Sequence, residues 1–135
     1  MLASHQHRLR VYWEDTDAGG VVFYANYLKF FERARTEWLR ALGVEQQALR
    51  DAQRLIFVVT ATELRYLAPA KLDDELTIVT TLAEPPRATF VFAQRALRGD
   101  VVLTEGRITV ACVDAGTFAP KRLPTNVVER LLLPG

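Results

Sequence analysis

Hydrophobic residues recur at helical spacing in one long segment of this chain and at alternate positions in most of the rest. Residues 26–42 carry apolar side chains every three or four positions, which predicts an amphipathic helix of about four to five turns. Asn26 is a candidate N-cap and Gly43 a candidate stop. Residues 44–51 and 126–133 predict two short helices. The apolar positions of the long helix are Tyr27, Phe30, Phe31, Ala34, Trp38, Leu39 and Leu42.

Before and after that helix, apolar side chains recur mostly at every second residue. Residues 6–13 alternate, with Leu9, Val11 and Trp13 on one face, and four later segments are rich in β-branched and aromatic residues. Those segments are residues 57–67, 76–82, 88–97 and 101–113. The linkers EPPR and RGD suit antiparallel hairpins. Because a lone helix must bury its stripe against the sheet, we expect an α+β fold in which a curved antiparallel sheet of about five strands wraps one helix.

The chain of 135 residues is expected to form one domain over residues 1–135. Its net charge of +1 gives no electrostatic case for binding nucleic acid. The N-terminus lacks the apolar stretch of a signal peptide, and no apolar run approaches the roughly 20 residues needed to cross a bilayer, so we expect a cytoplasmic protein that is not membrane-embedded. Apolar residues such as Val91, Leu103 and Val113 on the second sheet face predict that a partner chain covers part of it.

Several chemistries are disfavoured by the residues present. Ser4 is the only serine and no G-x-S-x-G elbow exists, which argues against a serine hydrolase. Cys112 lies in an apolar strand segment and is expected to be a buried structural thiol. His5 and His7 share a strand face as two metal ligands might, but a solvent-facing edge is the favoured interpretation. No nucleotide or metal motif adds to them, so we expect no cofactor and no metal.

Carboxylates cluster in the stretch EDTDAGG, where Glu14, Asp15 and Asp17 precede two glycines. A solvated turn is one interpretation. The stretch also begins like a calcium loop, but Asn26 stands at the twelfth position, where a bidentate Glu is required. The apolar residues 21–24 predict that the segment turns inward. A carboxylate drawn inward without a basic partner is costly, and is therefore a functional candidate.

The span YWEDTDAGGVVFYANYLKFFERARTEWL resembles the hotdog-fold 4-hydroxybenzoyl-CoA thioesterase family, and looks closest to its Tol-Pal-associated acyl-CoA thioesterase subgroup. The similarity continues through FVVTATELRYLAPAKLDDELTI and FAQRALRGDVVLTEGRITVACVD, nearly the whole chain. The resemblance implies a single hotdog thioesterase domain that hydrolyses acyl-CoA to free acid and CoA. It also implies a homodimer or homotetramer with the active site at the dimer interface. The acyl group and any role with the Tol-Pal system stay open.

The resemblance also implies roles for particular residues. Asp17 would be catalytic, as a nucleophile or as a general base on water, and both roles stay open. Backbone N–H groups around Tyr24, at the start of the long helix, would bind the thioester oxyanion. Many members of the closest subgroup have histidine where this chain has Tyr24, and tyrosine there looks more like the 4-hydroxybenzoyl-CoA branch. The departure weakens a role for a side-chain imidazole but does not affect one for backbone N–H donors. Val58, Val59 and Thr60 of the partner would line the site.

The phosphates of CoA call for basic residues near the mouth of the pocket, and Arg87, Lys121 and Arg122 are the candidates. Tyr27 and Tyr66 are expected in the core rather than in an acyl pocket. Two alternatives stay open. One is a hotdog enoyl-CoA hydratase or dehydratase, and the other is a non-catalytic acyl-CoA or acyl-carrier binding protein.

Overall fold

The computed structural model describes residues 3–132. Two single-turn 3-10 helices, η1 (Trp13–Asp15) and η2 (Tyr24–Asn26), flank the glycine loop, and η2 runs into α1. The other elements are β1 (Ser4–Arg10), α1 (Tyr27–Ala41), α2 (Gln46–Gln53), β2 (Leu55–Tyr66), β3 (Glu75–Leu82), β4 (Thr89–Arg98), β5 (Val101–Asp114) and α3 (Thr125–Leu132). None of the helices in this described range is long and apolar enough to span a bilayer. The cytoplasmic location stays a prediction.

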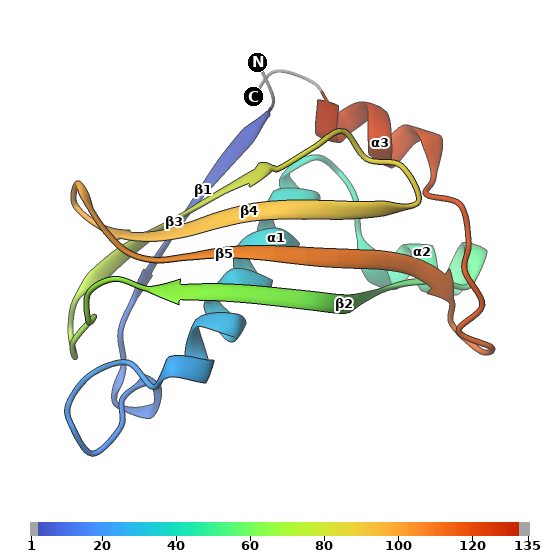
Figure 1. Cartoon of the computed structure of the whole chain (residues 1–135). Helices are drawn as coiled ribbons and strands as arrows, with labels where there is room; N and C mark the ends of the chain where they lie inside the picture. The colour runs from blue at the N-terminus through green and yellow to red at the C-terminus, as the bar shows by residue number, and fades with distance from the viewer. Residues whose placement is uncertain (1–2, 133–135) are drawn as a thin grey trace.

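The five strands form one antiparallel sheet in the order β1-β3-β4-β5-β2. Consecutive strands β2 and β3 are not neighbours, because β2 pairs with β5 at the opposite side of the sheet. β1 and β2 are therefore the two edge strands. Figure 1 shows α1 packed against one face of the curved sheet, with β2 along the edge nearest the glycine loop. The expected fold class, one long helix wrapped by a five-stranded sheet, is confirmed.

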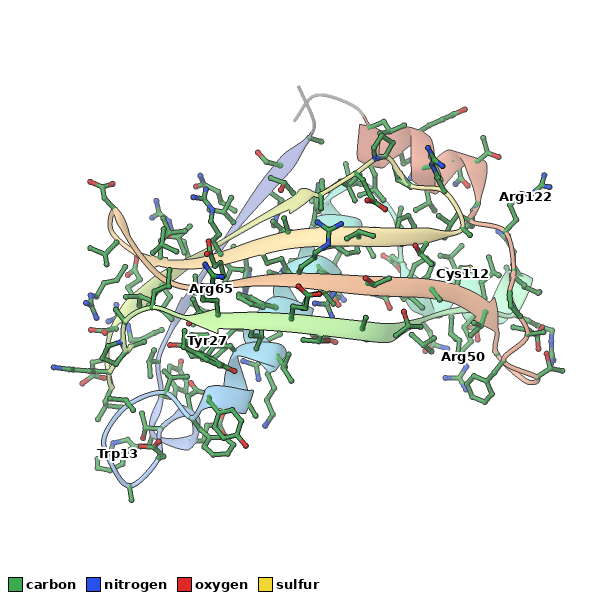
Figure 2. All side chains as sticks on the ribbon, in the orientation of Figure 1. Trp13, Tyr27, Arg50, Arg65, Cys112 and Arg122 are labelled. Carbon is green, nitrogen blue, oxygen red and sulfur yellow. The ribbon has the colours of Figure 1, made fainter. Side chains whose placement is uncertain are left out.

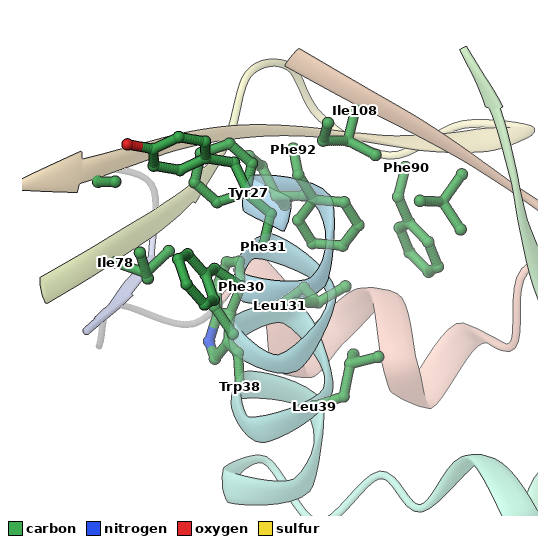
Figure 3. Packing of buried hydrophobic residues seen from close by; sticks show 14 of the residues in the cluster. Tyr27, Phe30, Phe31, Trp38, Leu39, Ile78, Phe90, Phe92, Ile108 and Leu131 are labelled. Carbon is green, nitrogen blue, oxygen red and sulfur yellow. The ribbon is translucent and has the colours of Figure 1, made fainter. Parts of the chain in front are cut away.

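The core lies between α1 and the sheet. The predicted helix face is buried through Tyr27, Phe31 and Trp38, with Leu42 as the C-cap rather than a buried position. Figure 3 shows Phe92 against α1 and Phe90 beside it, and the rings of Trp38 and Phe92 meet edge to face with centroids 6.0 Å apart. Such aromatic pairs add to the stability that burial of their area supplies.

Gly43 ends α1 as predicted. Its φ of 81° lies in the left-handed region, its N–H donates to Arg40, and the N–H of Val44 donates to Leu39. This is the pattern in which a glycine satisfies the last carbonyls of a helix at little conformational cost. The two short helices are also confirmed, as α2 and α3, although Leu133 lies outside the described residues.

The first strand is shorter than predicted. β1 ends at Arg10, and Val11 instead exchanges backbone hydrogen bonds with Asp73 and Asp74. The chain then turns through η1, which leaves Trp13 80% exposed rather than on the apolar face of a strand. The alternation predicted correctly that Val11 is buried, but it could not reveal that the backbone changes partner there.

The apolar residues of the second sheet face are buried by the chain itself. Val91, Leu103 and Val113 are all buried in the single chain. Val113 forms a bridge with Pro120, and the carbonyl of Leu103 accepts from residues 67 and 68. The expectation that a partner chain covers these three residues is wrong, because all three are already buried in the single chain, and Leu103 belongs to the hydrophobic core cluster.

Candidate active site

The glycine loop is a tight turn tied to the body of the protein. The Asp17 N–H donates to the carbonyl of Val21 (2.9 Å), and the Gly20 N–H donates to the carbonyl of Asp17 (3.0 Å). Val22 is buried, and its N–H donates to Ala70 (2.8 Å). Gly20 has a φ of 79°, which a glycine adopts without strain. The backbone around Asp17 is therefore held in one conformation.

The Asp17 side chain is exposed in the single chain. Its Oδ1 accepts a hydrogen bond from the Gly19 N–H at 2.8 Å, and Oδ2 has no partner within residues 3–132. The apolar run that follows does not turn inward as a whole, since Val22 is buried but Phe23 and Tyr24 are exposed. The inward turn is thus wrong for Phe23 and Tyr24. The sequence alone could not show this, because apolar side chains also occur at sites that another chain covers.

Asp15 is the buried carboxylate of the loop. It is 5% exposed and accepts hydrogen bonds from the Tyr12 N–H and the Asn26 amide, both at 2.8 Å. Its own carbonyl accepts from the Phe23 N–H at 2.9 Å. Asn26 occupies the N-cap position of α1, but its side chain binds Asp15 and makes no cap hydrogen bond. Asp15 therefore fixes the loop against the start of the helix, a role that the sequence analysis missed.

The start of the helix presents free N–H groups beside the loop. Tyr24 opens η2, and within the described residues neither its N–H nor that of Ala25 finds an acceptor. The Tyr24 carbonyl accepts from the Tyr66 hydroxyl at 2.8 Å, which holds this peptide in place. Burial raises the pKa of Tyr66, and the nearby Tyr24 and Tyr27 raise it further. Free N–H groups at a helix start are suited to binding a developing negative charge.

An exposed apolar surface surrounds this helix start. Tyr24 is 63% exposed, Phe23 packs on it with ring centroids 4.7 Å apart, and Tyr66 meets it edge to face. Tyr27 is buried as predicted, but Tyr66 is 47% exposed, so its expected place in the core is wrong for the single chain. Clusters of exposed aromatic residues on a folded chain usually mark a binding or association surface.

The predicted lining segment of β2 lies on a free sheet edge. Val59 pairs with Val110 and Ala61 pairs with Thr109, so Thr60 is the extra residue of a β-bulge. Val59 and Thr60 are exposed, whereas Val58 is half-buried. These residues occupy the middle of β2, whereas Tyr66, which contacts the helix start, ends the strand. Within one chain the three residues are not part of the Asp17 loop.

The predicted basic residues lie at the other end of the sheet. Figure 2 shows Trp13 beside the glycine loop and Arg122 at the opposite end of the molecule. Arg87 is exposed in the loop between β3 and β4. The Lys121 ammonium already donates to the Gln53 carbonyl at 3.0 Å, and it lies 3.4 Å from the carboxylate of Asp114. One chain therefore does not bring Arg122 to Asp17.

The other polar candidates have structural surroundings. Cys112 is buried, as predicted, and burial raises the pKa of its thiol. His5 is not solvent-facing: it is half-buried and stacks on Trp38, with ring centroids 6.5 Å apart. His7 is also half-buried. In the part of the chain that the structure describes, no three His, Cys, Asp or Glu side chains come together as a metal site.

The chain is similar to known thioesterases in both sequence and fold. Residues 11–131 match the family model of the thioesterase-like superfamily. The acyl-CoA thioesterase YbgC of Haemophilus influenzae is 50% identical over 119 residues, which cover 88% of each chain. The acyl-CoA thioester hydrolase YbgC of Escherichia coli O6:H1 is 46% identical over 121 residues, 89% of this chain and 90% of that one. The crystal structure of a probable thioesterase from Bartonella henselae, 38% identical, superposes with a TM-score of 0.85 and covers 90% of this chain and all of its own.

Proposed function

The chain belongs to the thioesterase-like superfamily, has its hotdog fold and is a thioester hydrolase, and we propose that it hydrolyses acyl-CoA thioesters to a free acid and CoA. The observation that carries this proposal is the likeness to acyl-CoA thioesterases at 46% and 50% identity over most of each chain. The free carboxylate oxygen of Asp17, beside unpartnered N–H groups at a helix start, supports the same chemistry.

In the proposed mechanism Asp17 supplies the attack on the thioester carbonyl. Its Oδ1 is engaged by Gly19, which orients the carboxylate, and Oδ2 is free to act. Oδ2 either attacks the carbonyl carbon, giving a mixed anhydride that water cleaves, or takes a proton from an attacking water. In both routes the C–S bond breaks and CoA leaves as a thiolate, so neither a serine triad nor a metal has to activate the leaving group.

Negative charge then develops on the carbonyl oxygen, and the start of the helix would stabilise it. The N–H groups of Tyr24 and Ala25 lack an acceptor in the described chain, and they open a continuous helical segment through η2 and α1. The helix dipole favours an anion at this end. Because Tyr66 holds the Tyr24 carbonyl, the donors are fixed before the substrate arrives. Losing one such donor typically costs about a hundred- to a thousandfold in rate.

A second copy of the chain would complete the site. Figure 1 shows the glycine loop and the first turn of α1 extending past the β2 edge of the sheet. The free edge of β2 offers backbone groups that a two-fold related copy can pair with. Such pairing, centred near Val59, turns the glycine loop of each copy toward the sheet of the other. Val58, Val59 and Thr60 of the partner would then line the site.

The same arrangement supports the proposed CoA-binding residues. A two-fold axis through β2 carries the loop of one copy toward the end of the sheet at which Figure 2 shows Arg122 of the other. Arg87 and Arg122 are both exposed and able to meet phosphates. Lys121 is a weaker candidate, because its ammonium already contacts Gln53 and the carboxylate of Asp114.

The test of the reaction is Asp17→Asn, with Glu14→Gln as its matched control on the same loop. Release of free CoA from a panel of acyl-CoA substrates is followed with DTNB. Removing the charge of Asp17 is expected to lower kcat by about a hundred- to ten-thousandfold, whereas the exposed Glu14 can lose its charge with little effect. Wild-type hydrolysis by Asp17→Asn would contradict the assignment. Enoyl-CoA hydration without thiol release would favour a hydratase, and binding without turnover would favour a carrier.

The test of the shared site is Val59→Lys, compared with Gln6→Lys on the other edge strand. Copies of a residue near a two-fold axis face each other, so two lysines there would repel and expose the pairing edge to solvent. We expect Val59→Lys to sediment as a monomer and to lose activity, and Gln6→Lys to keep both its assembly and its activity. A fully active monomer would show that one chain suffices.

A further inference from the structure

A small pocket lies between α1 and the half of the sheet nearest β2. Its volume is about 130 Å³. A cavity of about 150 Å³ with apolar walls holds a benzene ring in another protein, so this pocket matches an acyl group of about four to six carbons. The apolar part of the lining consists of Leu39, Phe57, Val59, Phe90, Phe92 and Val110. Figure 3 shows two of these residues, Phe90 and Leu39, on the same side of α1.

Four polar side chains from α1 and α2 complete the lining, and Arg35 is the one that carries a positive charge: Glu32, Arg35, Thr36 and Gln46. Arg35 is half-buried and reaches the pocket from α1, one turn from Glu32. Its Nη1 donates to Oε1 of the buried Gln94 at 3.0 Å, which is the only hydrogen bond of the guanidinium within residues 3–132. The amide of Gln94 donates in turn to Thr80 and to the carbonyl of Phe31. Arg35 is thereby aimed by a buried network rather than left to move in solvent.

The charge of Arg35 is not neutralised by contact. Among the described residues no carboxylate forms an ion pair with it. Burial lowers the pKa of Arg35, and the charge of Glu32 acts in the opposite direction. Glu32 also lines the pocket, but it is exposed, so solvent screens its field, whereas the half-buried Arg35 keeps several donors and a positive charge beside apolar walls. A guanidinium in this setting binds a carboxylate more strongly than any neutral group.

The pocket also lies where the proposed site would need an acyl subsite. Val59, on the free edge of β2, is part of its lining. Figure 1 shows the glycine loop extending past the β2 edge of its own sheet. The two-fold pairing proposed above therefore turns the glycine loop of one copy toward the pocket between α1 and β2 of the other. A thioester attacked by Asp17 of one copy would then extend its acyl chain into the Arg35 pocket of its partner.

We propose that this pocket receives the acyl group and that Arg35 selects short acyl chains ending in a carboxylate. The inference rests on the proposed thioesterase function and names the substrate class within it: CoA thioesters of dicarboxylic acids of about five carbons. The chain lies along Phe57, Phe90 and Phe92, and the far carboxylate meets Arg35. A neutral alkyl chain of the same length would leave the guanidinium without a partner.

The experiment compares matched substrates on the intact oligomer. Glutaryl-CoA, valeryl-CoA and 5-hydroxyvaleryl-CoA have the same chain length and differ only at the terminus. Wild-type protein is expected to hydrolyse glutaryl-CoA with a kcat/KM about ten- to a hundredfold above that for valeryl-CoA, the range of one charge-assisted contact. Asp17-dependent turnover of valeryl-CoA without this preference, or with the hydroxyl substrate preferred, overturns the inference and leaves the thioesterase function standing. If the protein hydrolyses none of the three substrates and no other acyl-CoA, both the inference and the thioesterase function are refuted.

The variants separate selection from a structural role. Arg35→Met keeps the apolar stem and is expected to lower the ratio of kcat/KM for glutaryl-CoA to that for valeryl-CoA by at least tenfold. Arg35→Lys should recover part of the glutaryl-CoA rate, and Arg33→Met, on an exposed position of the same helix, should change neither rate. An equal loss on both substrates by Arg35→Met would assign Arg35 to the fold alone. If that variant does not fold, the wild-type substrate ratio still decides.

Discussion

Two aspartates two residues apart are expected to separate stability from activity. Asp15 is 5% exposed and accepts two hydrogen bonds of 2.8 Å, whereas Asp17 is exposed and accepts one. Replacing each by asparagine keeps the shape and removes the charge. At position 15 the amide can accept from only one of its two donors, and its own NH₂ group then faces the other. At position 17 the amide oxygen can still accept from Gly19.

The magnitudes follow from this geometry. A hydrogen bond to a charged group contributes about 1.5–3 kcal/mol, and leaving a buried donor unsatisfied adds to its loss. We therefore expect Asp15→Asn to lower the free energy of unfolding by about 2–3 kcal/mol, and Asp17→Asn by less than about 0.5 kcal/mol, as for an exposed site. With a urea m-value of about 2 kcal/mol per molar, Asp15→Asn should lower the midpoint by about 1–1.5 M.

Urea unfolding followed by tryptophan fluorescence measures these midpoints, and DTNB release measures activity on the same preparations. The double variant Asp15→Asn with Asn26→Asp exchanges donor and acceptor, so it should recover most of the lost stability. Asp17→Asn should unfold with the wild type and hydrolyse acyl-CoA far more slowly. Equal midpoints for Asp15→Asn and wild type, or no recovery in the double variant, would refute the claim that the Asp15–Asn26 contact holds the loop.

Three further outcomes are expected. First, N–H groups of the turn after β5 and, to a smaller extent, two nearby cations hold the pKa of Asp114 well below its ordinary value of 3.8. The stability that Asp114 contributes is therefore complete above about pH 4 and is lost as the pH falls further. Asp114→Asn should unfold at a lower temperature than wild type at pH 7 and should lose less stability in acid. Burial raises the pKa of the Cys112 thiol, so DTNB should label it only after denaturation, and native protein should add no background to the activity assay. A Cβ on Gly106 would lie 2.7 Å from Leu64 and 2.9 Å from Phe31, so Gly106→Ala should cost about 1–3 kcal/mol in a urea titration.

Local patterns predicted the elements well because their causes are local. The helix from Tyr27 to Ala41, its stop at Gly43 and the hairpins of the sheet follow from side-chain spacing and from residues with particular backbone preferences. Cys112 was predicted to be buried for the same reason, since it lies within an apolar strand. The family resemblance added the reaction, which no periodicity contains.

The same patterns did not predict burial correctly where it depends on pairing between distant segments. Leu103 and Val113 look like an uncovered face in the sequence, but both are buried in the single chain, where Leu103 belongs to the core cluster and Val113 bridges to Pro120. Tyr66 looks like a core residue, yet it ends an edge strand and remains 47% exposed. Burial depends on which strand is an edge, and the position of β2 beside β5 is decided by the whole topology.

The roles of Asp15 and Asp17 likewise depend partly on the sequence and partly on the tertiary structure. The sequence by itself determined that carboxylates, glycines and a helix start come together, because these features are adjacent in the chain. Only the tertiary structure decided that Asp15 is the buried acid and that Asp17 keeps a free oxygen. The reason is physical: Asp15 and Asp17 are chemically identical, and their difference comes from the Asn26 amide that the fold brings to one of them and not to the other.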